Sequence, residues 1–184
     1  MAYETISLSK IEAAERQLKQ CIRMFFKEED PVSIRTLAEA AGEVLSDIGD
    51  YQGIVRDKKM IKPERYREWL KAIFEDRNFF KHGKKDSDRI LEFKPIMNDI
   101  VILDAVTMHM KYTKNWTIET LLYQIWNQLN YPDFWYEDHP IYKAVEGKSY
   151  SSDCKEKSFM RKIIKAIDNG EVNFSFPEIK SIES

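Results

Sequence analysis

Apolar residues recur every three or four positions along most of this 184-residue chain, and capping residues and prolines mark where each run begins and ends. This spacing puts the apolar side chains on one face of an α-helix, and that face must pack against other helices. The first two runs predict helices over about 7–29 and from Pro31 to about residue 48, with Asp30 as the cap of the second helix. The small residues at 38–42 favour close approach of a neighbouring helix.

Four further runs follow the same pattern. They predict helices over about 63–82, 95–114, 117–130 and 152–169. The run over 95–114 is apolar on more than one face, so we expect it at the centre of the fold and most deeply buried. One short segment near 172–176 is a candidate strand. The sequence therefore predicts an all-α fold, with residues 1–184 forming a single domain built as a bundle of about six helices.

Composition agrees with a compact domain. Hydrophobic residues make up 43% of the chain, and there are only six Gly and six Pro, which excludes disorder for the bulk of it. Two cysteines, Cys21 and Cys154, are too few for a zinc cage of thiolates, and we interpret them as buried thiols. The N-terminus lacks the pattern of a secretory signal and no apolar run approaches the ~20 residues of a membrane span. We therefore expect a cytoplasmic protein that does not enter a membrane.

The 29 basic and 31 acidic residues give a net charge of −2, but they are unevenly distributed. Residues 56–94 carry thirteen basic and eight acidic side chains, a local charge of +5, whereas residues 1–55 carry −4 and residues 95–184 carry −3. A basic middle segment indicates an anionic partner. The alternative is a solvated helix face with mixed charges.

Acid–base and metal chemistry has few candidates because the chain has only three histidines, His82, His109 and His139. No Glu-x-x-His pair, HExxH motif or Gly-rich phosphate loop occurs in the sequence. We therefore expect neither a metal centre nor a cofactor, and we interpret the acidic residues beside His139 as a solvated loop. The aromatic residues 134–136 are expected to cap the core, with a stacking platform for bases as the alternative.

One string with chemical potential remains, Arg77-Asn78-Phe79-Phe80-Lys81-His82, near the end of the third predicted helix. Arg77 falls within the apolar arc of that helix, so its guanidinium needs either an anionic ligand or a carboxylate partner. The candidate carboxylates are Glu39, Glu43 and Asp104.

The other motif residues have their own alternatives. Asn78 and His82 are four residues apart and therefore side by side on a helix. A functional interpretation has Arg77 fix a phosphate, His82 exchange a proton and Asn78 orient one of them. Alternatively, His82 only stabilises the negative end of the helix. Phe79 is expected on the opposite face, either at a protein interface or packed on the loop before residue 95.

An Arg followed after four to six residues by His, with Asn directly after the Arg, resembles the signature of the HEPN superfamily of small helical domains. Residues 30–41, taken together with Arg77-Asn78-Phe79-Phe80-Lys81-His82, also resemble a group of uncharacterised bacterial HEPN-like proteins. This second resemblance covers most of residues 5–130. It implies a HEPN-like helical bundle.

For function, the resemblance implies a metal-independent endoribonuclease whose site forms between two protomers. In such a site Arg77 would hold the scissile phosphate, His82 would transfer protons, and Asn78 would orient a partner. Lys81, Lys84 and Lys85 would contact RNA. The expected partners are a second copy of the chain, RNA, and an antitoxin or other protein. The alternative is a non-catalytic helical module for dimerisation or interaction.

Overall fold

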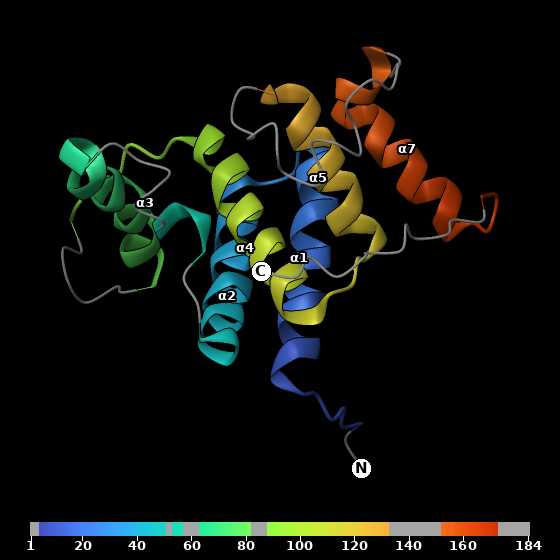
Figure 1. Ribbon diagram of the computed structural model, residues 1–184, viewed down its shortest axis with the longest axis horizontal. Helices are drawn as coiled ribbons and strands as arrows, with labels where there is room; N and C mark the ends of the chain where they lie inside the picture. Colours follow the sequence, from blue (N-terminus) through green and yellow to red (C-terminus); the bar gives the residue numbers. More distant parts are fainter. Residues whose placement is uncertain (1–3, 51–52, 57–62, 82–87, 133–151, 173–184) are drawn as a thin grey trace.

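The computed structural model describes residues 4–50, 53–56, 63–81, 88–132 and 152–172. These residues fold into six α-helices joined by turns and short 3-10 helices, and no strand occurs among them (Figure 1). The predicted all-α class and helical-bundle architecture are therefore confirmed. Apart from Val172, the candidate strand near 172–176 lies outside the described residues, as do the aromatic residues 134–136. None of the described helices is long and apolar enough to span a bilayer.

The first two helices form a hairpin with ends fixed by side-chain caps. α1 (Lys10–Lys27) begins at Ser9, whose hydroxyl accepts a hydrogen bond from the Glu12 N–H while the Glu12 carboxylate accepts one from the Ser9 N–H. α2 (Pro31–Gly49) begins at Asp30, whose carboxylate caps the first turn as predicted. The caps start both helices within a few residues of the positions that the periodicity indicates.

α4 (Asn98–Thr113) follows the 3-10 turn Pro95–Met97 and lies at the centre of the bundle, as predicted (Figure 1). Its buried residues cover more than one face. A Cβ on Gly42 of α2 would come within 3.4 Å of the Met108 Cε, so the small residues of α2 do allow α4 to approach closely.

α5 (Ile118–Asn130) corrects one expectation, because it is buried over a larger share of its length than α4. It packs against α1, α4 and α7 (Lys157–Asp168). The difference lies in the last turn of α4, where Lys111 and Tyr112 are exposed, whereas no residue of α5 is exposed. The 3-10 turn Ser152–Lys155 precedes α7. Gly170, with φ of +70°, follows it and supplies the predicted stop.

One arginine links three helices on this side of the bundle. Arg23 of α1 donates through Nε to Glu119 of α5 at 2.7 Å, and its terminal nitrogens donate to Asp168 of α7 at 2.6 and 2.9 Å. Edge-on aromatic contacts add apolar packing between α1 and α5. They involve Phe25, Phe26, Tyr123 and Trp126. The aromatic packing therefore holds α5 to α1, and the ion pairs of Arg23 hold both α5 and α7 to α1.

α3 (Tyr66–Lys81) lies at one edge of the bundle (Figure 1). The α-helical segment begins three residues later than predicted, because Pro63–Arg65 forms a 3-10 turn. The 3-10 turn Ile54–Arg56 anchors the beginning of the helix, since the Trp69 Nε1 donates to the Val55 carbonyl at 2.9 Å. Only a limited apolar surface connects α3 to the core, so polar contacts carry much of its attachment.

The main polar contact is the side chain of Arg35, which is fully buried. Its Nη2 donates to Asp76 of α3 at 2.8 Å, its Nε donates to Glu39 of α2 at 2.8 Å, and its Nη1 lies 3.5 Å from the Asn98 Oδ1 of α4. Burial raises the pKa of both carboxyl groups, and the guanidinium charge opposes that rise. Arg35 therefore joins α2, α3 and α4 through one buried ionic cluster.

Replacing Arg35 should expose the dependence of the fold on this cluster. We expect Arg35→Met to lower the free energy of unfolding by about 3–5 kcal/mol, because it leaves two buried carboxylates without a counter-ion. The triple variant that adds Glu39→Gln and Asp76→Asn should regain most of the loss. Urea denaturation followed by circular dichroism measures both effects. A loss below about 1 kcal/mol in the single variant would show that the cluster is not structurally important.

Candidate functional site

The end of α3 brings two cations onto one carboxylate. Arg77 and Lys81 are four residues apart and therefore share a face of the helix. The Arg77 Nη2 donates to the Glu43 Oε1 and the Lys81 Nζ donates to the Glu43 Oε2, so α2 and α3 are bridged by a three-residue ion cluster. We call Arg77, Lys81 and Glu43 the α3-end cluster.

This cluster identifies the partner of Arg77. Of the three candidate carboxylates, Glu43 forms the pair, Glu39 is bound to Arg35, and Asp104 accepts a hydrogen bond from the Val55 N–H at 3.0 Å. The Arg77 side chain is 21% exposed, so it lies at the edge of the bundle. An external anion can therefore reach the guanidinium without unfolding the helix.

Positive charge exceeds negative charge around Glu43. Arg56 stacks on the ring of Phe74 with its guanidinium carbon 4.9 Å from the ring centre, and Arg77 lies 5.8 Å from the same centre. The hydrogen bond from Lys81, with the charges of Arg77, Lys81 and Arg56, holds the pKa of Glu43 below its usual value. Glu43 is thus a carboxylate at neutral pH, surrounded by three cations.

A small cavity lies behind the cluster, with Glu43, Arg56, Arg77 and Asp104 among its lining residues. Its volume of about 40 Å³ would hold about three water molecules, which is too little for a nucleotide. A phosphodiester would therefore bind at the outer edge, where Arg77 and Lys81 meet solvent. Asp104 lies on the inner side, and burial raises its pKa to about 6.

The structure brings together only part of the predicted motif. Asn78 is exposed, beside the α3-end cluster in sequence but on another face of the helix. His82, Lys84 and Lys85 lie outside the described residues.

Phe79 is half-buried, with its ring centre 5.9 Å from that of Phe80. Phe80 in turn packs on Phe93 with the ring centres 5.4 Å apart, so the three rings form one apolar group with the segment before Pro95. Phe80 and not Phe79 makes the ring contact to that segment, so both alternatives for Phe79 stay predictions.

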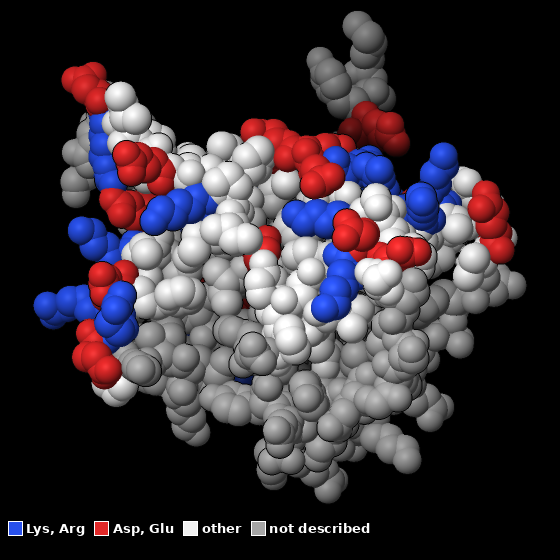
Figure 2. All heavy atoms as spheres, turned by 90° about the horizontal axis from the view of Figure 1, so that it is seen from above, with Lys and Arg blue, Asp and Glu red and all other residues white. Residues whose placement is uncertain are grey.

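Sequence reasoning missed two features of this region. It did not identify Arg35 as the buried arginine, and it did not anticipate that Glu43 would serve two cations. Arg35 and Glu39 are four residues apart, so a local signal existed for that pair alone. The pairings of Arg35 with Asp76 and of Glu43 with Arg77 and Lys81 have no local signal, since those residues are 34 to 41 positions apart. On the face seen in Figure 2, described charges of both signs are intermingled.

The raised pKa of Asp104 predicts a pH effect on stability. The folded state favours the neutral acid, so the contribution of this group to stability is present below about pH 4 and is lost as pH rises through about 6. We expect Asp104→Asn to reduce the fall in unfolding free energy between pH 4 and pH 7 by about 2–3 kcal/mol. Urea denaturation across that range measures it. Asp47→Asn, at an exposed carboxylate of α2, is the matched control; identical pH curves for wild type and Asp104→Asn would contradict the prediction.

Within the described ranges, no three His, Cys, Asp or Glu side chains are grouped so that they could hold a metal ion. Comparison with family models, curated proteins and solved structures finds no match to this chain. The geometry of the described residues is therefore the basis for a functional proposal.

Proposed function

We propose that the chain is a metal-independent endoribonuclease of HEPN type, with its site at the end of α3. The observation that supports this best is the α3-end cluster, in which Arg77 and Lys81, with Arg56 nearby, surround a single carboxylate at a solvent-facing edge. Arg and Lys are the side chains that bind phosphate most strongly, and Arg does so with two parallel hydrogen bonds. A phosphodiester that replaces Glu43 would meet preorganised positive charge.

In this proposal each motif residue has a separate role. Arg77 binds the scissile phosphate and stabilises the charge that develops on it. The ribose 2′-oxygen attacks phosphorus, the bond to the 5′-oxygen breaks, and the products are a 2′,3′-cyclic phosphate and a free 5′-hydroxyl. His82 removes the 2′-hydroxyl proton or protonates the leaving oxygen, and Asn78 orients a partner. Lys81, Lys84 and Lys85 hold neighbouring phosphates.

A homodimer belongs to the same proposal. One Arg, one Asn and one His are few groups for binding a phosphate and handling two proton transfers. A two-fold axis near the motif would double the set and enclose it. The further partners in this proposal are RNA and an antitoxin or other protein.

The second candidate is a non-catalytic helical interaction module. The pairing of Arg77 with Glu43 favours it, because an ion pair between α2 and α3 is what a purely structural arginine would make. The two functions predict different effects on RNA cleavage and RNA binding when Arg77 or Glu43 is substituted.

Cleavage of single-stranded RNA in excess EDTA tests the proposal directly. We expect the wild-type chain to release products ending in a cyclic phosphate, and we expect Arg77→Ala and His82→Ala each to reduce the rate by about 100-fold or more, because each removes a transition-state contact. Arg67→Ala, at an exposed arginine of the same helix, should leave the rate unchanged. Activity that persists in both site variants, or a wild type that cleaves nothing, would favour the interaction module.

Glu43→Gln separates the two functions further. If Arg77 and Lys81 bind RNA phosphate, removing the competing carboxylate should raise RNA affinity by about fivefold at low salt, since roughly 1 kcal/mol of opposing charge is lost. Unfolding free energy should fall by less than about 1 kcal/mol, because Glu43 is substantially exposed. Filter binding and urea denaturation measure the two quantities. A loss of stability without any gain in RNA affinity would support the module.

A further inference from the structure

A second basic surface lies on α7, at the edge of the bundle opposite α3 (Figure 1). The helix has two distinct faces. Met160 and Ile164 are buried against the bundle, whereas Arg161, Lys162 and Lys165 are exposed. At 3.6 residues per turn these three cations fall within an arc of about 100° on the outer side of the helix. We call Arg161, Lys162 and Lys165 the α7 basic face.

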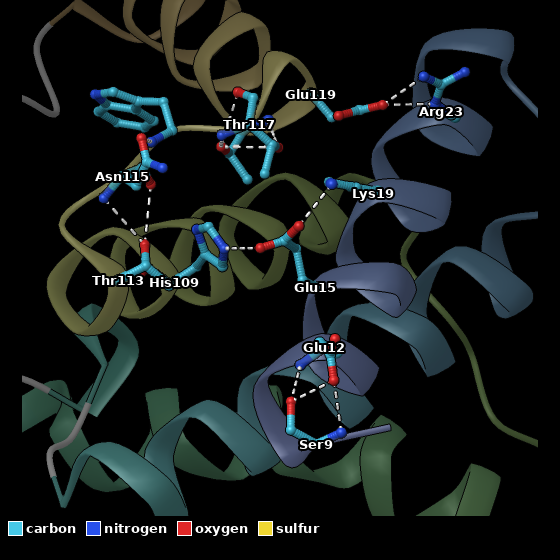
Figure 3. Close-up of polar contacts among 12 residues, drawn as sticks. Ser9, Glu12, Glu15, Lys19, Arg23, His109, Thr113, Asn115, Thr117 and Glu119 are labelled. Atoms are coloured by element: carbon cyan, nitrogen blue, oxygen red, sulfur yellow. Dashed lines mark hydrogen bonds and ion pairs between the residues drawn. The ribbon is translucent and has the colours of Figure 1, made fainter. Parts of the chain in front are cut away.

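The positive charge of this face is not neutralised within the helix. Among the described residues, none of the three cations forms an ion pair or a hydrogen bond through its side chain. Asp168 is the one acidic residue of α7, and it already accepts hydrogen bonds from both terminal nitrogens of Arg23 at 2.6 and 2.9 Å. Arg23 is held in place by Glu119 as well (Figure 3). Asp168 therefore serves α1 and not the basic face.

The charges on either side of α7 do not cancel the basic face. Glu156 and Glu171 lie beyond the two ends of the helix, and Glu171 accepts a hydrogen bond from the Asn169 Nδ2 at 2.9 Å. Lys157 belongs to the inner side, because its ammonium lies 3.6 Å from the centre of the Phe25 ring. The outer side thus presents three unpaired cations at neutral pH.

α7 is fixed to the bundle at both ends. The Lys155 carbonyl, just before the helix, accepts a hydrogen bond from the Trp126 Nε1 at 2.9 Å. At the other end, the pairing of Asp168 with Arg23 holds the last turn to α1. The two buried apolar residues lie between these contacts. Because the helix is already ordered, a ligand of the basic face loses little affinity to ordering the backbone that carries it.

The residues of this face distinguish between the possible anionic partners. A protein partner needs an apolar centre in its interface, but every exposed residue of α7 is polar: Ser158, Arg161, Lys162, Lys165 and Asp168. A helix that binds a lipid surface inserts its apolar face, but that face of α7 packs against α1 and α5. The backbone of a nucleic acid needs only cations, because its binding is driven by charge and the release of counterions.

We propose that the α7 basic face binds the phosphate backbone of a nucleic acid strand, with Arg161, Lys162 and Lys165 each contacting a phosphate. The contacts are independent of base sequence, since no aromatic side chain of α7 is exposed for stacking. The choice of RNA as the strand rests on the proposed nuclease function. In that case α7 holds the RNA at one edge of the bundle and the α3-end cluster acts on it at the other.

Binding of single strands of about 20 nucleotides tests the proposal, with 2′-O-methyl RNA and DNA as the two probes. Neither probe has a free 2′-hydroxyl, so neither is cleaved by attack of a 2′-oxygen. Fluorescence anisotropy between about 50 and 200 mM salt measures the affinity. We expect the triple variant Arg161→Gln/Lys162→Gln/Lys165→Gln to bind about tenfold more weakly. The slope of log K against log salt should become shallower by about 2, because each phosphate contact on a single strand contributes about 0.7.

A matched control removes the same charge elsewhere. Lys10→Gln/Arg16→Gln/Lys114→Gln changes three exposed cations outside α7, so its affinity should stay within about twofold of the wild type and its slope unchanged. Circular dichroism confirms that both triple variants are folded. If the α7 variant unfolds, Lys162→Gln alone should make the slope shallower by about 0.7. Tighter binding of 2′-O-methyl RNA than of DNA identifies RNA as the strand, and equal binding identifies a site for the backbone of either.

Three results would overturn the proposal. They are wild-type affinity and slope in the α7 triple variant, an equal loss in the control, and tighter binding of polyglutamate or of phosphatidylglycerol vesicles than of either strand. The outcome is separable from that of the nuclease. A wild type that binds strands through α7 but cleaves no RNA keeps this proposal and removes the nuclease. Cleavage of RNA by a chain whose α7 variant binds normally does the reverse.

Discussion

The buried guanidinium of Arg35 determines where α3 lies, and the α3-end cluster depends on that position. The buried residues of α3 are Ile73 and Asp76, and Asp76 is held by Arg35. Arg77 is the next residue, so its direction toward Glu43 follows from how Asp76 is bound. A helix attached mainly through ion pairs and hydrogen bonds, with little apolar surface, is placed by geometry more than by burial. Hydrogen-bond direction thus sets the orientation of the basic side chains.

Local chemistry explains why the helices could be predicted from the sequence. The Ser9, Asp30 and Thr117 caps lie within three residues of the groups that they bind, and a capping pattern can be recognised in the sequence alone. The Arg35 cluster and the pairing of His109 with Glu15 join residues 41 and 94 positions apart. Periodicity says which face of a helix is buried but not which residue it meets. The partner of Arg77 could therefore be reduced to three carboxylates and no further.

α4 lines a cavity on each of two sides without joining them. Asp104 and His109 are five positions apart, which places them about 140° apart around the helix. Asp104 binds the backbone near α3, whereas His109 binds Glu15 of α1. An amphipathic helix with one solvated face would have only one buried side for polar groups. Because α4 is covered on several faces, it can bury a titratable group on each of two sides.

Glu43 is the main constraint on any function of the α3-end cluster. It is ionised at neutral pH and already satisfies Arg77 and Lys81, so an incoming phosphate must take over both contacts. A phosphodiester has the same single negative charge and two free oxygens as a carboxylate, so it can accept the same hydrogen bonds from Arg77 and Lys81, while the displaced Glu43 carboxylate stays nearby and opposes binding. RNA differs from a single carboxylate in the number of its charges. Arg56 adds a third cation beside Arg77 and Lys81, and a polyanion can bind several cations at once. Discrimination between RNA and small anions at this cluster would therefore come from the length of the strand and not from a single phosphate.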